Sequence, residues 1–121
     1  MLATFCSYED HFGPFHPMTL RLLTEVGTAL WRHDRTDDAL IVLQRGLRDA
    51  TRALGRNHGL RLRVLAALRE IFTEIDDYEK AAAVQKELLE CNAEIFGEEH
   101  AETSAARETL AQLLLRNAAA L

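Results

Sequence analysis

The sequence contains few of the residues that mark several other classes of protein. Its 121 residues include two Cys, two Pro and six Gly. So little Pro and Gly excludes a collagen-like or linker-like chain. Cys6 and Cys91 have no Cys-x-x-Cys spacing and indicate neither a disulfide nor a zinc site. Even the longest apolar runs, such as Ala39–Leu43, are far shorter than the roughly 20 residues that a membrane span needs.

The first residues also lack the features of a secretion signal. The segment Met1–Cys6 has neither a basic start nor a long apolar centre, and Glu9 and Asp10 follow closely. We therefore expect a cytoplasmic protein. Folding at this length buries roughly two thirds of the surface of the unfolded chain, so the core needs no metal or disulfide to hold it.

Charge is distributed unevenly along the chain, whose formal net charge is -5. Residues 45–69 hold seven Arg and one acid, whereas residues 70–108 hold twelve acids and three basic residues. Such asymmetry can steer an acidic partner to the middle of the chain or a basic partner to its C-terminal half. The simpler alternative is that most of these charges form the solvated faces of helices.

A short pattern recurs at a fixed interval, with its glycines at positions 13, 55 and 97. It reads apolar-Gly-x-x-His-small and occurs at Phe12–Pro17, Leu54–Gly59 and Phe96–Ala101. Apolar residues between the copies keep the same register, as Leu30 pairs with Phe72 and then Leu114. A fixed period of this kind predicts a repeated supersecondary unit.

Each repeat reads as two helices, because its apolar residues follow helical spacing in two stripes. We predict helices at about residues 18–33, 37–54, 59–75, 78–96 and 101–117, with a short leading helix in residues 2–12. Thr36 is expected to cap the second helix, and Asp76 and Asp77 to act in the same way one repeat later. Each repeat Gly is expected to close a helix in a left-handed conformation. No strand pattern is present.

These features resemble the tetratricopeptide repeat in its 42-residue, kinesin-light-chain-like form. The resemblance rests on the Gly-x-x-His-Pro junction, the large-small pair Val26–Gly27 and the alanines Ala39 and Ala81, with Arg69 as a departure. It implies an all-α fold, an α-α superhelix or solenoid of antiparallel helix pairs with about two and a half repeats. The single domain 1–121 would comprise a leading segment 1–16, repeats 17–56 and 57–98, and a lone capping helix and tail 99–121.

The sequence offers no recognisable catalytic or metal-binding group. His16, His58 and His100 belong to successive units about 10 Å apart, whereas zinc ligands lie about 2 Å from one ion. We expect each histidine to bond the neighbouring turn at the start of a helix. Glu70 and Glu74 lie one turn apart, which favours a solvated acidic face over an acid and base pair. We therefore predict no enzymatic activity and no cofactor.

In the resembling family the first helix of each repeat lines the concave face, which would place several side chains in a groove. Arg21 and Arg63 could grip carboxylates there, and Trp31 could anchor an interface; each could also be ordinary surface or core. The family typically has an asparagine in the groove that holds a peptide backbone, and these positions are Glu25, Ala67 and Thr109 here. The Lys, Asn and Arg residues with which some family members hold the acidic tail of a chaperone are also missing. The partner-binding candidates are Arg21, Thr28, Trp31, Arg32, Arg63, Glu70, Glu74 and Gln112, with Thr24 among their neighbours.

The sequence is compatible with three functions. The first is a non-catalytic adaptor or scaffold that binds a protein or peptide in the groove. The second is a self-associating structural solenoid fragment, with a homodimer through the leucine-rich C-terminal helix. The third, nucleic-acid binding through Arg45–Arg69, is disfavoured by the net charge and the lack of interleaved aromatic residues.

Overall fold

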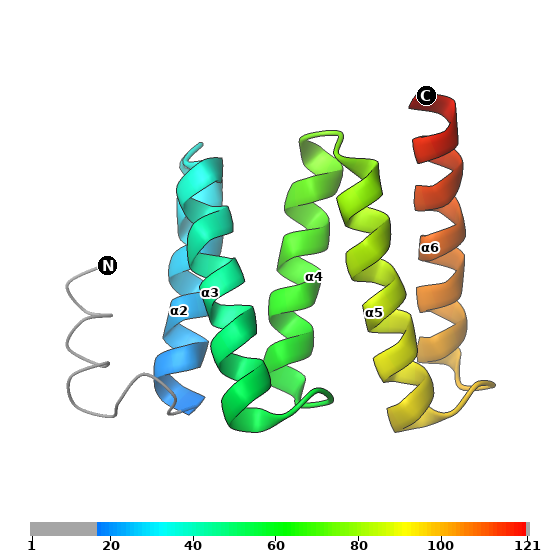
Figure 1. Ribbon diagram of the computed structural model, residues 1–121, viewed down its shortest axis with the longest axis horizontal. Helices are drawn as coiled ribbons and strands as arrows, with labels where there is room; N and C mark the ends of the chain where they lie inside the picture. The colour runs from blue at the N-terminus through cyan, green and yellow to red at the C-terminus, as the bar shows by residue number, and fades with distance from the viewer. Residues whose placement is uncertain (1–16, 121) are drawn as a thin grey trace. The chain divides into compact units, whose positions relative to one another are not determined.

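The computed structural model describes residues 17–120 and contains five α-helices joined by short turns (Figure 1). They are α2 (Pro17–Arg32), α3 (Thr36–Leu54), α4 (Gly59–Glu74), α5 (Tyr78–Phe96) and α6 (Ala101–Ala120). Residues 17–120 contain no strand, which confirms the all-α prediction. The predicted bounds are correct to within three residues. The expected leading helix and His16 lie outside the described residues.

Two compact units make up the described chain. The first contains α2, α3 and α4 up to Ala67, and the second begins at Leu68 and contains the rest of α4 with α5 and α6. Within the first unit α2 runs antiparallel to α3, and within the second α5 runs antiparallel to α6 (Figure 1). The single domain over residues 1–121 stays a prediction.

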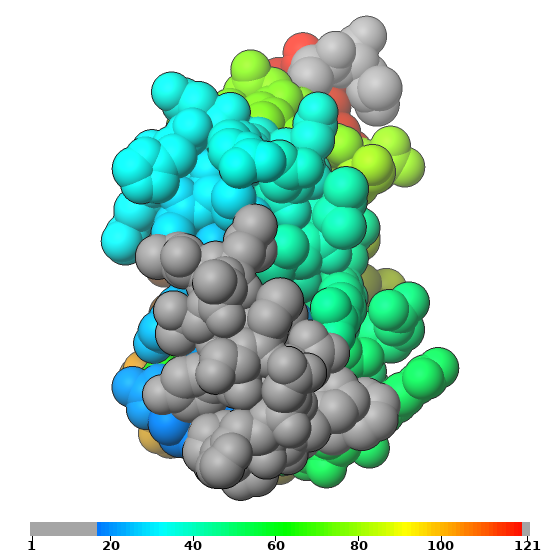
Figure 2. Space-filling model, turned by 90° about the vertical axis from the view of Figure 1, so that its left-hand side faces the viewer, coloured from blue at the N-terminus to red at the C-terminus, as the bar shows by residue number. Residues whose placement is uncertain are grey.

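The close packing of α2 on α3 depends on glycine. A Cβ atom at Gly27 would lie 2.6 Å from both Cγ and Cδ2 of Leu43, and one at Gly46 would lie 3.2 Å from Cδ2 of Leu23. Leu43 is completely buried, and Leu23 and Val26 are nearly so. Where no grey atoms cover them, the surfaces of α2 and α3 adjoin in Figure 2. Hydrophobic burial therefore holds the helix pair together, and the two glycines set how closely the helices approach.

The second unit has polar residues at the positions equivalent to this glycine and leucine. Arg69 and Gln85 occupy the places that Gly27 and Leu43 hold one repeat earlier. Arg69 Nη1 donates a hydrogen bond of 3.0 Å to Gln85 Oε1, and Gln85 Nε2 donates one of 2.9 Å to the Ala106 carbonyl. Gln85 is only 2% exposed, so these bonds satisfy a buried amide. The departure at Arg69 is thus matched by the replacement of leucine with glutamine on α5.

The turns repeat with the same period. Asp34 and Asp76, which close α2 and α4, both have φ of 62°. Gly55 and Gly97, which close α3 and α5, have φ of 88° and 93° with ψ of 171° and 162°. Both glycines have the positive φ that was predicted, but their extended ψ differs from the left-handed helical conformation expected for a helix cap. This combination of φ and ψ is open almost only to glycine. Gly13 lies outside the described residues.

One predicted cap is wrong and another is confirmed. Because α3 begins at Thr36, the residue before it, Arg35, occupies the cap position and makes no side-chain capping bond. The Arg35 guanidinium instead donates to Asp38 Oδ2, with an Nε to Oδ2 distance of 2.9 Å. In the next repeat Asp77 Oδ1 accepts a 3.3 Å hydrogen bond from the backbone N–H of Lys80, as an N-cap does.

The two described repeat histidines begin α4 and α6 in the same way. His58 Nδ1 accepts the backbone N–H of Leu60 at 3.1 Å, and its carbonyl accepts the N–H of Leu62. His100 Nδ1 likewise accepts the N–H of Glu102 at 3.0 Å. Each ring nitrogen thus satisfies one of the free N–H groups at a helix start, which confirms the structural role predicted for these histidines.

Replacing this cap should destabilise the protein modestly. His58→Ala is expected to lower the free energy of unfolding by about 0.5–2 kcal/mol, the usual cost of a lost side-chain cap. His58→Ser keeps an acceptor at the same place and should lose much less. Urea unfolding followed by circular dichroism measures both, and an equal loss in the two variants would rule out a capping role for the ring nitrogen.

Candidate functional site

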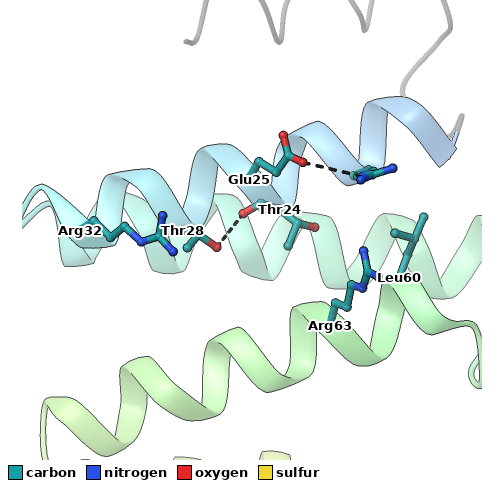
Figure 3. A pocket seen from close by; sticks show the side chains of 7 residues that line it. Thr24, Glu25, Thr28, Arg32, Leu60 and Arg63 are labelled. Atoms are coloured by element: carbon teal, nitrogen blue, oxygen red, sulfur yellow. Dashed lines mark hydrogen bonds and ion pairs between the residues drawn. The ribbon is translucent and has the colours of Figure 1, made fainter.

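An open groove of about 260 Å³ lies in the first unit, between α2 and the start of α4 (Figure 3). Most of its lining comes from one face of α2, where residues spaced three or four apart follow each other along the helix. The apolar face of the same helix, with Leu23 and Val26, is buried. The lining residues are Arg21, Thr24, Glu25, Thr28 and Arg32 of α2 and Leu60 and Arg63 of α4.

Positive charge dominates the groove, since three guanidinium groups face one carboxylate. Arg21 Nε lies 3.7 Å from Glu25 Oε1, and both side chains are more than half exposed. Such an exposed pair is weak. Arg32 and Arg63 have no hydrogen-bond or ion-pair partner within residues 17–120. The groove therefore presents two available guanidinium groups, one from each helix (Figure 3).

The two threonines between the arginines act as hydrogen-bond acceptors towards the groove. Thr24 Oγ1 donates its hydrogen to the Leu20 carbonyl at 3.0 Å, and Thr28 Oγ1 donates to the Thr24 carbonyl at the same distance. Because each hydroxyl hydrogen is used within α2, only the oxygen lone pairs remain for a ligand. Leu60 adds a half-buried apolar contact at the start of α4.

The structure brings half of the predicted partner-binding residues together. Arg21, Thr28, Arg32 and Arg63 all line the groove, as does the neighbouring Thr24. Trp31 is half-buried and lies outside the lining. The remaining candidates belong to the second unit, are exposed, and are also outside the lining: Glu70, Glu74 and Gln112.

Two residues that line the groove, Glu25 and Leu60, were not predicted from the sequence to do so. Glu25 was noted only as a departure from the family pattern, although its position four residues after Arg21 signals an ion pair on one helix face. Nothing in the sequence indicates that Leu60 lines a groove, because a leucine in the first turn of a helix is normally predicted to be a core residue.

The arginine-rich segment does not form one exposed basic surface. Arg61 is only 4% exposed, and its guanidinium donates to Thr51 Oγ1 at 2.8 Å and to the Arg56 carbonyl at 2.9 Å. Arg45 pairs with Asp49 at 3.5 Å. Side chains used inside the fold cannot also hold phosphates, so the structure adds nothing in favour of nucleic-acid binding through Arg45–Arg69.

The C-terminal helix exposes part of its apolar surface. Leu113 is buried, whereas Leu114 and Leu115 are 51% and 72% exposed. Scattered exposed leucines are common on monomeric proteins. The homodimer through this helix therefore stays a prediction.

Metal-binding clusters and membrane-spanning helices are both absent from the described part of the chain. Residues 17–120 contain no group of three or more His, Cys, Asp or Glu placed to hold a metal ion. Within this range, none of the helices has the length and apolar character needed to cross a membrane. The thiol of Cys91 is buried.

Comparison with known families identifies the repeat. Residues 19–59 match the family model of the tetratricopeptide repeat, in its kinesin-light-chain-like type. The matched segment contains the Gly27–Leu43 contact and most of the α2 side of the groove. No curated protein matches the sequence. Residues 19–59 thus form a unit that matches the tetratricopeptide repeat, and the constant repeat register and the helix pairs continue the same two-helix pattern through the rest of the described residues.

Proposed function

We propose that this protein is a non-catalytic interaction module, an adaptor or scaffold, whose groove between α2 and α4 binds a segment of a partner protein. The observation that carries the proposal is the pair of available guanidinium groups of Arg32 and Arg63, which come from two helices and face one groove. Tetratricopeptide repeats generally serve as non-catalytic interaction modules, which supports the same function.

The shape of the groove favours a polypeptide over a small metabolite. Its volume of about 260 Å³ lies below the roughly 300–1,000 Å³ typical of small-molecule sites, and it is open to solvent. Arginine suits such a surface, because its planar fork can hold a carboxylate with two parallel hydrogen bonds. A segment of a partner can therefore lie along α2 with its side chains between the two helices.

Selection of ligands from a random peptide library displayed on phage tests this function. Peptides captured by the wild-type protein should bind the Arg32→Ala/Arg63→Ala variant at least about tenfold more weakly, since hydrogen bonds to charged groups contribute about 1.5–3 kcal/mol each. Isothermal titration calorimetry gives the affinities. Arg48→Ala/Arg52→Ala, which removes two exposed arginines of α3 outside the groove, is the matched control.

Two outcomes would contradict the proposal. Either the library yields no peptide that binds the wild type, or the captured peptides bind the groove variant as tightly as the wild type. An equal loss in the α3 control would also contradict it, because it would point to non-specific attraction by positive charge. The cytoplasmic location stays a prediction.

A further inference from the structure

We infer that the bound segment is extended and carries two acidic side chains about five residues apart, one held by Arg32 and the other by Arg63. This inference rests on the proposed function and specifies the ligand of the same groove. Its basis is the separation of the two arginines, the acceptors between them and the single carboxylate at the groove.

The separation follows from the repeat register and helix geometry. Arg63 occupies the place on α4 that Arg21 occupies on α2, because the two lie one repeat apart. Arg32 follows Arg21 by eleven residues, which is about 16 Å along a helix that rises 1.5 Å per residue. An extended chain that follows the groove parallel to α2 advances about 3.3 Å per residue, so about five residues cover this axial offset, while the two long arginine side chains reach into the groove from its two sides. Figure 3 shows Arg63 beside Leu60, towards the opposite end of the groove from Arg32.

The threonines favour an extended ligand over a helical one. Thr24 and Thr28 offer only acceptor oxygens to the groove, one helical turn apart. An extended segment has backbone N–H groups available to donate to these oxygens, whereas a helix uses its own N–H groups internally. The groove thus has acceptors at its middle and cations at both ends.

Glu25 favours a ligand whose acidic side chains are not adjacent in its sequence. Its carboxylate lines the groove and is paired with Arg21 across 3.7 Å, which offsets the charge of the third arginine. A continuous acidic run would place further carboxylates beside Glu25, where like charges repel. The site should therefore discriminate against acidic tails and prefer two isolated acids.

Peptides of identical composition test this spacing. Fluorescein-labelled twelve-residue peptides of serine and alanine would carry two glutamates separated by two, five or eight positions, and fluorescence anisotropy would give their affinities. We expect the five-residue spacing to bind about five- to tenfold more tightly than the other two. Arg32→Ala and Arg63→Ala should each remove this preference, and Arg52→Ala should leave it unchanged. A peptide with six consecutive glutamates should gain affinity from Glu25→Gln.

The outcomes separate this inference from the proposed function. Equal affinity for the three spacings overturns the inference, even if library peptides still bind in a manner that depends on Arg32 and Arg63. Failure of every library peptide to bind overturns the proposed function itself. A preference for the two-residue spacing would also overturn the inference, because it would place both acids at one arginine.

Discussion

Gly27→Ala is expected to destabilise the protein by about 1–3 kcal/mol, the usual cost of forcing an extra carbon into a packed core. The added Cβ would lie 2.6 Å from two carbons of the Leu43 side chain, which is fully buried. This effect opposes the helix propensity of alanine, which alone would stabilise the protein by about 1 kcal/mol. Chemical denaturation measures the net change.

Two further variants separate packing from propensity. Gly59→Ala adds the same methyl group at the start of α4, where nothing lies within 4 Å, and should change stability little. Leu43→Ala alone should cost about 2–5 kcal/mol, but the cost of Gly27→Ala should largely vanish in its presence because the clashing atoms are gone. Wild-type stability in Gly27→Ala would contradict the close approach of α2 and α3.

Gln85→Leu is expected to lower the free energy of unfolding by about 1–3 kcal/mol, although it creates the residue found at the equivalent position 43. The substitution removes the acceptor for Arg69 and the donor to the Ala106 carbonyl, both supplied by a side chain that is 2% exposed. The half-buried Arg69 guanidinium then loses its hydrogen bond to Gln85 and keeps the 3.7 Å pairing with Glu70 Oε1. Thermal and urea unfolding give the change.

The partner substitution shows whether the two positions act as a pair. In Arg69→Ala/Gln85→Leu no guanidinium is left without its amide partner, and the leucine side chain faces a methyl group in place of a charge. The double variant should therefore be more stable than the sum of the two single changes predicts, by about 0.5–3 kcal/mol. Strict additivity would show that the two residues are energetically independent despite their 3.0 Å bond.

Most of the fold was predictable because the sequence repeats the first helix of the unit three times and the second helix twice. The five helices, the capping histidines and the glycine turns all follow from one pattern repeated at a constant interval. Local chemistry near a helix end was less predictable. Threonine is a common N-cap residue, so Thr36 was predicted to cap the second helix. The helix begins one residue earlier than predicted, so Arg35 occupies the cap position.

The candidate site was predictable only in part, because it depends on tertiary contacts. The register placed Arg21, Arg32 and Arg63 on helices that line a groove, and the structure brings them to one. The register could not show that Arg21 is paired with Glu25, or that Trp31 lies outside the groove lining. Burial of an arginine such as Arg61 depends on hydrogen-bond partners ten and five residues away in sequence, which no helical pattern reveals.

The central claim is that a partner segment binds between α2 and α4, and NMR chemical-shift mapping tests it most directly. The isotope-labelled protein of 121 residues would be titrated with the library peptide that binds most tightly. The account predicts that the largest backbone shifts fall at Thr24, Thr28, Arg32 and Arg63. Shifts concentrated on the exposed leucines of α6, or on the arginines of α3, would contradict it.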